Sequence, residues 1–231
     1  MSRLSIIIPT LNEAEIIVPT LAPLQHSRGR DAEIILADGG STDETVGLAR
    51  PFCDRIETAR RGRASQMNAG AAAAQGDVLL FLHADTRLSE GSPEQIREAF
   101  AGTPRVWGRF DVRIDSRHPA LWLVAQMMNL RSRWSGIATG DQAIFVRRRD
   151  FESVGGFPDM PIMEDIAFSR AMRRRSWPIC LSMPVVTSAR RWERRGVIAT
   201  IFLMWRLRLA YFLGADPADL AVAYGYAPRD V

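Results

Sequence analysis

Three polar segments of this sequence each come directly after a run of apolar residues. A continuous apolar run of this length is typical of a parallel strand buried on both faces. Ligands bind beyond the carboxyl ends of such strands in open α/β sheets. The isolated carboxylate of Asp85 therefore stands where a divalent cation could be held. The runs and the polar segments that follow them are 4–8 with 9–13, 32–37 with 38–43, and 78–82 with 83–86.

The size and composition of the chain fit one large α/β domain with a full core. It has 231 residues, of which 47% are hydrophobic and 24% charged. The formal net charge is +4, and all 30 basic residues are arginine. Because the guanidinium fork binds phosphates and carboxylates bidentately, this balance fits an anionic partner. The arginines are dispersed and form no recognisable nucleic-acid-binding module, so nucleic acid is not expected.

The two cysteines, Cys53 and Cys180, indicate neither a disulfide framework nor a metal cluster. The N-terminus begins with a strand and carries no signal peptide pattern, which predicts a cytoplasmic location. No stretch is long and clean enough to span a bilayer. The nearest is 197–213, which contains Arg206 and Arg208.

Strands and helices alternate through the first half of the chain, and this rhythm predicts an open, mostly parallel sheet with helices on both faces. Three of the helices are expected to begin at capping boxes, which are formed by Thr10 with Glu13, Ser41 with Glu44, and Ser92 with Gln95. The expected strands are 4–8, 32–37, 54–57 and 78–82, and the expected helices are 13–24, 42–49, 64–74 and 93–100.

After residue 105 the alternation breaks and the C-terminal part becomes helical. We expect a single domain over 1–231, with a nucleotide-binding half over 1–104 and an acceptor-side half over 105–231. Strands are expected at 106–114 and 143–147, an extended run at 178–186, and helices at 119–134, 164–175 and 197–213.

The motifs, taken in order, resemble those of the family-2 glycosyltransferases, which are inverting enzymes of the GT-A fold. Within that family the chain is most similar to the small bacterial subgroup of selenodomain-associated transferases. The resemblance covers almost the whole chain and depends on the joint order of the motifs, since each alone is weak. They are Pro9-Thr10-Leu11-Asn12-Glu13, Asp38-Gly39-Gly40-Ser41-Thr42-Asp43, Asn68-Ala69-Gly70, Asp85, Gly140-Asp141-Gln142 and Glu164-Asp165.

The resemblance implies a donor site for a sugar nucleotide, UDP- or GDP-linked. It implies that Asp38 accepts N–H bonds from the base. Arg63 would stand beside a helix N-terminus as a phosphate ligand. Helix capping is the alternative reading for Thr10 and Glu13. The nucleotide-binding residues implied are Pro9, Thr10, Asn12, Glu13, Asp38, Gly39, Arg63, Asn68, His83 and Ala84.

The metal position departs from the family pattern. The family has Asp-x-Asp there, whereas this chain has His83-Ala84-Asp85. The retained Asp85 is implied to bind Mg²⁺ or Mn²⁺ and link it to the diphosphate, and one carboxylate with phosphate oxygens and waters suffices for Mg²⁺. His83 is open to three readings: a contact to ribose or phosphate, a second ligand that would favour Mn²⁺, or a buried histidine of the core.

The acidic pair Glu164-Asp165 is implied to supply the general base, with Asp165 the first choice and Glu164 the second. Their alternative role is to complement the dipole at a helix start. Gly140 and Asp141 are implied to position the sugar or acceptor. Arg191 and Trp192 resemble part of the Gln-x-x-Arg-Trp motif of processive members. The motif implies that Arg190 or Arg191 reaches the diphosphate and that Trp192 stacks on a sugar face, and the alternative is a basic loop before an apolar helix. Ser188 replaces the Gln of the motif, which argues against polymer synthesis.

The apolar helices 119–134 and 197–213 leave two partners open. Basic and aromatic helices can lie on a bilayer and receive a lipid-linked acceptor, which would place the protein at the inner face of the membrane. Packing within the core or in a homodimer is the alternative.

Two rival functions also stay open: a noncatalytic nucleotide-sugar-binding protein, and a sugar-phosphate nucleotidylyltransferase. The second would need a Gly-rich basic loop after the first strand, where this chain has Pro9 to Glu13.

Overall fold

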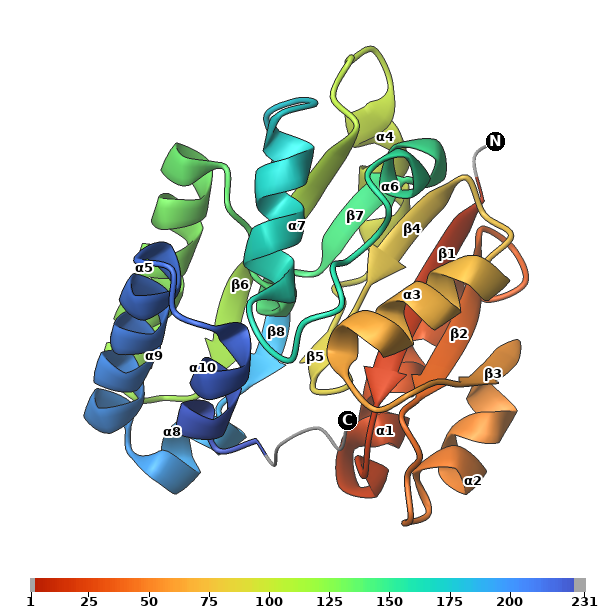
Figure 1. Ribbon diagram of the computed structural model, residues 1–231. Helices are drawn as coiled ribbons and strands as arrows, with labels where there is room; N and C mark the ends of the chain where they lie inside the picture. The colour runs from red at the N-terminus through yellow and green to blue at the C-terminus, as the bar shows by residue number, and fades with distance from the viewer. Residues whose placement is uncertain (1–2, 227–231) are drawn as a thin grey trace.

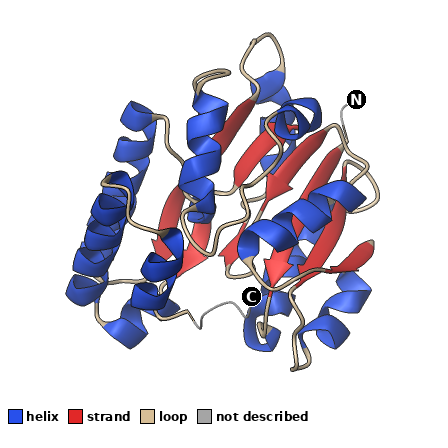
Figure 2. Ribbon diagram, viewed as in Figure 1, coloured by secondary structure: helices blue, strands red, loops and turns tan. Residues whose placement is uncertain are grey.

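The computed structural model describes residues 3–226, which form one mixed sheet between layers of helices (Figure 1; Figure 2). Each predicted strand is present within about two residues of its expected bounds. A short strand, β5, was not expected. The strands are β1 (Leu4–Thr10), β2 (Ala32–Asp38), β3 (Arg55–Thr58), β4 (Val78–Phe81), β5 (Thr86–Arg87), β6 (Trp107–Asp115), β7 (Ile144–Arg147) and β8 (Ile179–Ser188).

The strand order is β3-β2-β1-β4-β7-β6-β8-β5. Strands β1 to β4 are mutually parallel, β7 runs antiparallel to β4 and β6, and β8 is parallel to β6 but antiparallel to β5. Six of the eight strands therefore point the same way, and the mostly parallel sheet is confirmed. Since β7 lies between β4 and β6, strands of the two sequence halves share one sheet.

The helices cover both faces of this sheet. The predicted helices are present, and α6, α8 and α10 are additional. They are α1 (Ala14–Leu21), α2 (Thr45–Ala49), α3 (Arg63–Ala73), α4 (Ser92–Phe100), α5 (Pro119–Ser135), α6 (Arg148–Ser153), α7 (Glu164–Arg173), α8 (Arg190–Arg195), α9 (Val197–Phe212) and α10 (Pro217–Tyr224), with 3₁₀ turns η1 (Ala22–His26), η2 (Arg50–Phe52) and η3 (Gly140–Gln142).

Strand β1 shows why the apolar runs gave the sheet correctly. Ile6 and Ile8 face one core cluster with α1, α4 and α5, whereas Ile7 faces the other with α3, α6 and α7. Alternate side chains of a strand point to opposite faces, so a strand covered on both sides must be apolar throughout. A third cluster joins α7 to α9 and α10 and lies beyond the sheet.

The three expected capping boxes are wrong. Thr10 ends β1, and its hydroxyl is buried without a partner. Ser41 bonds Asp38 instead of starting a helix, and Ser92 follows Gly91, which holds the N-cap in a left-handed conformation. The hydroxyls of Ser41 and Ser92 make loop contacts that sequence spacing alone does not reveal.

No helix within residues 3–226 is long and apolar enough to cross a membrane.

Candidate active site

The loops after β1 and β2 are joined to each other by hydrogen bonds. The Asn12 carboxamide oxygen accepts from the Thr42 N–H at 2.8 Å, and the Asn12 N–H donates to Ser41 Oγ at 2.9 Å. Asp38 closes its own loop, accepting from the Gly40 and Ser41 N–H groups and from Ser41 Oγ. A carboxylate offers about four acceptor positions, so roughly one remains on Asp38 for a ligand.

Gln66 is a site residue that the sequence analysis missed. Its side-chain amide lies in α3 and donates to the carbonyl oxygens of Thr10 and Ala37, which ties the ends of β1 and β2 together. Gly39 makes this possible, because a Cβ there would approach the Gln66 side chain to 3.0 Å. The only sequence signal was a polar residue at a position that the helix buries.

Arg63 opens α3 and faces the other charged site residues. Its pKa lies above the usual range, chiefly because of Tyr226 and then because of Glu164, Asp141 and Asp85. The expectation that Arg63 stands at a helix N-terminus is met, since α3 begins at this residue. Tyr226 brings a C-terminal residue to the same place, which the sequence gave no reason to expect.

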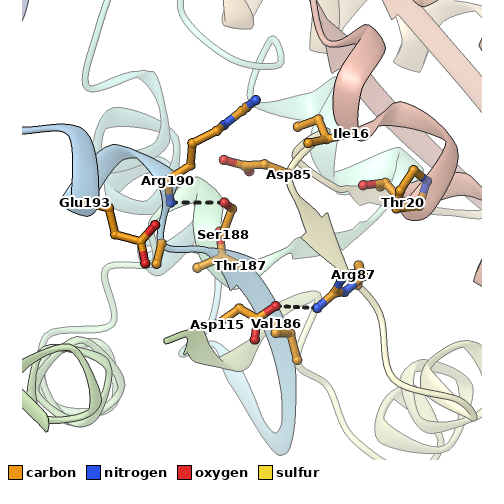
Figure 3. Close-up of a pocket in the computed structure, with 12 residues that line it drawn as sticks. Ile16, Thr20, Asp85, Arg87, Asp115, Val186, Thr187, Ser188, Arg190 and Glu193 are labelled. Carbon is orange, nitrogen blue, oxygen red and sulfur yellow. Dashed lines mark hydrogen bonds and ion pairs between the residues drawn. The ribbon is translucent and has the colours of Figure 1, made fainter. Parts of the chain in front are cut away.

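Asp85 lies at the edge of a second cleft, between α1 and the end of β8 (Figure 3). Its carboxylate and the side chain of Arg190 come from opposite walls. The loop is fixed by its backbone, since Thr20 Oγ1 donates to the Ala84 carbonyl oxygen at 2.6 Å and the Ser188 N–H donates to that of Asp85. Arg190 also pairs with Glu13 at 2.8 Å, which joins the β1 loop to α8.

The residues around Asp85 fit a cation that is shared with a diphosphate. Within residues 3–226, no group of three or more His, Cys, Asp or Glu side chains could hold a metal. The one hydrogen bond to the Asp85 carboxylate in that range is long, 3.4 Å from Thr86 Oγ1. Mg²⁺ is commonly bound by one or two carboxylates together with phosphate oxygens and waters. The oxygens of Asp85 are suited to that arrangement. The protein side chains near it would not complete a metal site without the phosphate oxygens.

His83 turns away from Asp85 and towards the η3 turn. Its Nδ1 lies 3.3 Å from the Asp141 carboxylate, and the His83 side chain is 10% exposed. Gly140 packs against Nε2 and Cε1 of the imidazole, because a Cβ at that position would lie 2.2 Å from His83 Nε2 and 2.3 Å from Cε1. Gly140 is therefore required for close approach rather than for a special backbone angle.

Replacing Gly140 with Ala should displace the His83 ring and destabilise the protein. Overpacking of this kind costs about 1–3 kcal/mol, which corresponds to a loss of roughly 2–10 °C in Tm. Differential scanning calorimetry would measure it. The matched control is Gly47→Ala in α2, where the nearest atom to the new Cβ is a flexible Glu44 oxygen at 3.4 Å. An unchanged Tm in the Gly140 variant would contradict the packing argument.

Glu164 and Asp165 begin α7, as predicted. Asp165 is bonded to the backbone: it accepts from the Gly140 N–H at 2.9 Å and from the Ile166 N–H at 2.7 Å. Glu164 is 5% exposed. Burial, followed by the negative charge of Asp165, raises the pKa of Glu164 to about 7. Met163 precedes them with φ of +69°, a strained value that is typical of functional sites.

The raised pKa of Glu164 predicts a stability that falls with pH. Between the unfolded value near 4.5 and about 7 the folded protein keeps a proton that the unfolded chain releases, so stability is lost as pH rises through this window. Glu164→Gln should therefore raise Tm at pH 8 by roughly 3–8 °C and leave it unchanged at pH 4.5. Glu152→Gln, an exposed site in α6, is the control and should show no such difference. A variant less stable than the parent at pH 8 would contradict the burial effect.

One pocket gathers predicted residues from distant parts of the chain: Arg63, His83, Gly140, Asp141, Glu164, Asp165 and Arg191. Sequence reasoning did not select the other lining residues. They are Thr139, Ile162, Met163 and Ile166 beside η3 and α7, and Met204, Arg208 and Tyr224 on α9 and α10. Tyr224 is held there by Arg191 and Arg195, whose guanidinium groups lie 5.0 and 5.5 Å from its ring centroid.

The other predicted site residues lie outside this pocket, and two of them, Asn68 and Trp192, make structural contacts instead. The Asn68 amide donates to the Phe157 carbonyl oxygen at 2.8 Å, and its oxygen accepts from the Phe157 N–H at 3.0 Å. Asn68 therefore fastens the segment that leads to Glu164 instead of lining the pocket. Trp192 packs partly buried against the main core cluster. The ring is an anchor for α8, since the core already uses the apolar surface that sugar stacking would need.

Comparison with known proteins agrees with this fold. The family pattern of glycosyl transferase family 2 matches residues 5–177. The PGL/p-HBAD biosynthesis glycosyltransferase of Mycobacterium bovis is 33% identical over 173 residues, which are 66% of this chain and 62% of the relative. The chain thus spans about three fifths of the length of that relative.

Solved structures share the fold at low identity. TarS of S. aureus with UDP-GlcNAc has a TM-score of 0.66 at 17% identity, covering 80% of this chain and 58% of TarS. The mannosyltransferase PcManGT of Pyrobaculum calidifontis with GDP-Man and Mn²⁺ has a TM-score of 0.63 at 22% identity, covering 97% of this chain and 69% of that one.

The fold is thus that of the GT-A glycosyltransferases. The chain belongs to glycosyl transferase family 2.

Proposed function

We propose that the whole chain acts as one enzyme, which moves a sugar from a UDP- or GDP-linked donor to an acceptor hydroxyl with inversion at the anomeric carbon. The observation that carries this proposal is the pocket that gathers Arg63, His83, Asp141, Glu164 and Asp165 from four separate segments. Carboxylates and guanidinium groups in one partly enclosed site fit a reaction that moves a proton and releases a diphosphate.

On the donor side, the joined loops of Asn12 and Asp38 would hold the nucleoside, and Arg63 would bind the phosphates. Asp85 would hold Mg²⁺ or Mn²⁺. Such a cation, when bound, neutralises charge on the departing diphosphate. The relative PcManGT is known with GDP-Man and Mn²⁺, which supports this arrangement.

On the acceptor side, Asp165 would take the proton of the acceptor hydroxyl as its oxygen attacks the anomeric carbon and the bond from that carbon to the diphosphate breaks. The two N–H bonds from Gly140 and Ile166 fix the carboxylate and leave acceptor positions free for that proton. Glu164, partly protonated near neutral pH, would limit the charge beside it.

A thermal-shift panel tests the proposed function. The probes are UDP, GDP, UDP-glucose and GDP-mannose, each with and without Mn²⁺. A matched donor at 100 times its Kd should add about 2.7 kcal/mol of stability, visible as a Tm rise of several degrees. If no nucleotide shifts Tm, the proposal fails. Binding without turnover across many acceptors would favour a noncatalytic role, and pyrophosphate release from a nucleoside triphosphate would favour a nucleotidylyltransferase.

We also propose that the outer faces of α5 and α9 contact a membrane on its cytoplasmic side and thereby reach a lipid-linked acceptor. The two helices lie along the same side of the molecule (Figure 1). Neither contains an acidic residue. Their large apolar side chains are 40–79% exposed: Trp122, Leu123, Met127, Leu130, Trp134, Ile198, Phe202, Trp205, Leu209, Phe212 and Leu213.

Charge favours a bilayer over a second copy of the chain as the occupant of this surface. Arg206 is exposed on the same face of α9, and Arg194 and Arg195 are exposed just before it. In a symmetric dimer these arginines would meet with no acid on either helix, whereas anionic headgroups would attract them.

Vesicle flotation should distinguish a bilayer from a second copy of the chain as the occupant of this surface. With vesicles of anionic lipid at low salt the protein should float, and Trp205→Gln should weaken binding severalfold because interfacial Trp anchors are lost. Vesicles of neutral lipid should bind less. Protein that stays in solution, or that instead dimerises in sedimentation, would contradict a membrane contact.

A further inference from the structure

Two arginines beside the proposed catalytic pocket lack any partner in the described part of the chain. Within residues 3–226, no hydrogen bond or ion pair involves the guanidinium group of Arg131 in α5 or that of Arg208 in α9. The Nε atoms of both are buried, as is Nη2 of Arg131. Buried charged groups are normally paired, so these two require an explanation.

The two guanidinium groups are close enough to repel each other. Burial lowers the pKa of Arg131 to about 10, and the charge of Arg208 lowers it further in the same direction. Burial also lowers the pKa of Arg208. Within residues 3–226 neither guanidinium group has a direct ion pair, and the charge of Asp165 acts on both without one. Two like charges that are held together in this way destabilise the free protein. An external anion would remove that cost.

The place of Arg208 identifies which substrate would supply the anion. Arg208 lines the pocket with Glu164 and Asp165, and the carboxylates that act on its charge are Asp165 and Asp141. Asp85, on the proposed diphosphate side, acts instead on Arg63 and Arg190. Arg63 lines the same pocket and is acted on by Glu164 and Asp141 before Asp85, so it faces both sides of the site. Arg208 lies beside the proposed base and can hold a second anion while Arg63 and Arg190 hold the diphosphate.

We propose that the acceptor carries a phosphate or carboxylate group that binds the guanidinium group of Arg208, with the charge of Arg131 adding to the attraction. This inference rests on the glycosyl transfer proposed above. Arginine binds such groups through a planar, bidentate fork. Since α5 and α9 also carry the exposed apolar surface, the anion has two possible sources, a phosphorylated lipid and a small phosphorylated acceptor.

Calorimetric titration of the protein saturated with UDP or GDP and Mn²⁺ would test this. The probes are octyl phosphate, inorganic phosphate and octyl glucoside, all below the concentrations at which they form micelles. Octyl phosphate should bind, and octyl glucoside should bind at least tenfold more weakly. Tighter binding of octyl phosphate than of inorganic phosphate would indicate the lipid, and equal binding would indicate the small acceptor.

Three variants locate the site. Arg208→Gln should weaken octyl phosphate binding by about 10-fold to 100-fold, and Arg208→Lys should restore part of it. Arg174→Gln, an exposed site just after α7 that belongs neither to the pocket nor to the proposed membrane surface, is the control and should bind as the parent does. Affinity for the nucleotide should stay within about twofold in all three.

The Tm of the free protein distinguishes this role from a structural one, because the loss of a merely structural arginine would lower Tm. Arg131→Gln removes an uncompensated charge, so its Tm should rise by about 2–4 °C, and octyl phosphate should stabilise it less than the parent. Absence of octyl phosphate binding by the parent, equal binding by Arg208→Gln, or a loss of nucleotide affinity in that variant would overturn this inference. Failure of the parent to bind any nucleotide would instead overturn the proposed function.

Discussion

Replacing Asp165 with Asn should reduce kcat by about 10²- to 10⁴-fold, the usual contribution of a general base. The carboxamide can still accept the N–H of Gly140 or that of Ile166, so the loop that carries Asp141 should stay in place. Donor affinity should therefore be unchanged. The measurement is transfer or donor hydrolysis under saturating donor, with the nucleotide Kd determined separately.

Glu164→Gln is the matched control for this experiment. It removes the neighbouring carboxyl, which is buried and titrates near 7, and it should cost less than tenfold in kcat. The pH dependence of kcat should lose any inflection near 7 in that variant. If Glu164→Gln lost most of its kcat and Asp165→Asn kept nearly all of it, Glu164 would be the base and Asp165 its neighbour.

Replacing Asp85 with Ala should abolish the effect of Mn²⁺ or Mg²⁺ on nucleotide binding and lower kcat by about 10²- to 10³-fold, since a bound cation supplies several kcal/mol of charge stabilisation. The fold should tolerate the change, because the backbone contacts from Thr20 and Ser188 hold the loop, while the carboxylate accepts a single long bond from Thr86. Titration of UDP or GDP with and without Mn²⁺ measures the first effect.

Asp115→Ala is the control for Asp85. It lies in the same cleft, where it pairs with Arg87 at 2.6 Å (Figure 3). That ion pair is exposed, so its loss should change stability by less than about 1 kcal/mol and leave metal-dependent binding intact. Equal loss in both variants would indicate damage to the cleft, and an unchanged Asp85 variant would contradict the proposed metal position.

Local physics explains which parts of the fold could be predicted from the sequence. Apolar runs such as 78–82 can be satisfied only by strands covered on both faces, so the strands and their polar ends followed directly. The meeting of Asp141 with His83 could be anticipated only through the family resemblance. Nothing in the spacing of these residues places η3 beside the end of β4.

Residues whose partners lie far away in sequence could not be predicted. Asn68 resembles a nucleotide ligand by motif but bonds Phe157, and Ser41 has capping-box spacing but bonds Asp38 in its own loop. Gln66 and Arg208 carry no motif at all. Their importance comes from what tertiary packing places next to them, which is information that a single sequence does not contain.

The pattern shared with the family ends at residue 177, whereas the pocket wall formed by Met204, Arg208 and Tyr224 comes later in the chain. The part of the chain that matches the family and the helices that complete the pocket are therefore separate along the sequence. A chimera that joins residues 1–177 of this protein to the tail of a relative would be expected to keep its donor and exchange its acceptor. Selection for a new product could then act on α9 and α10 without disturbing the carboxylates of the proposed active site.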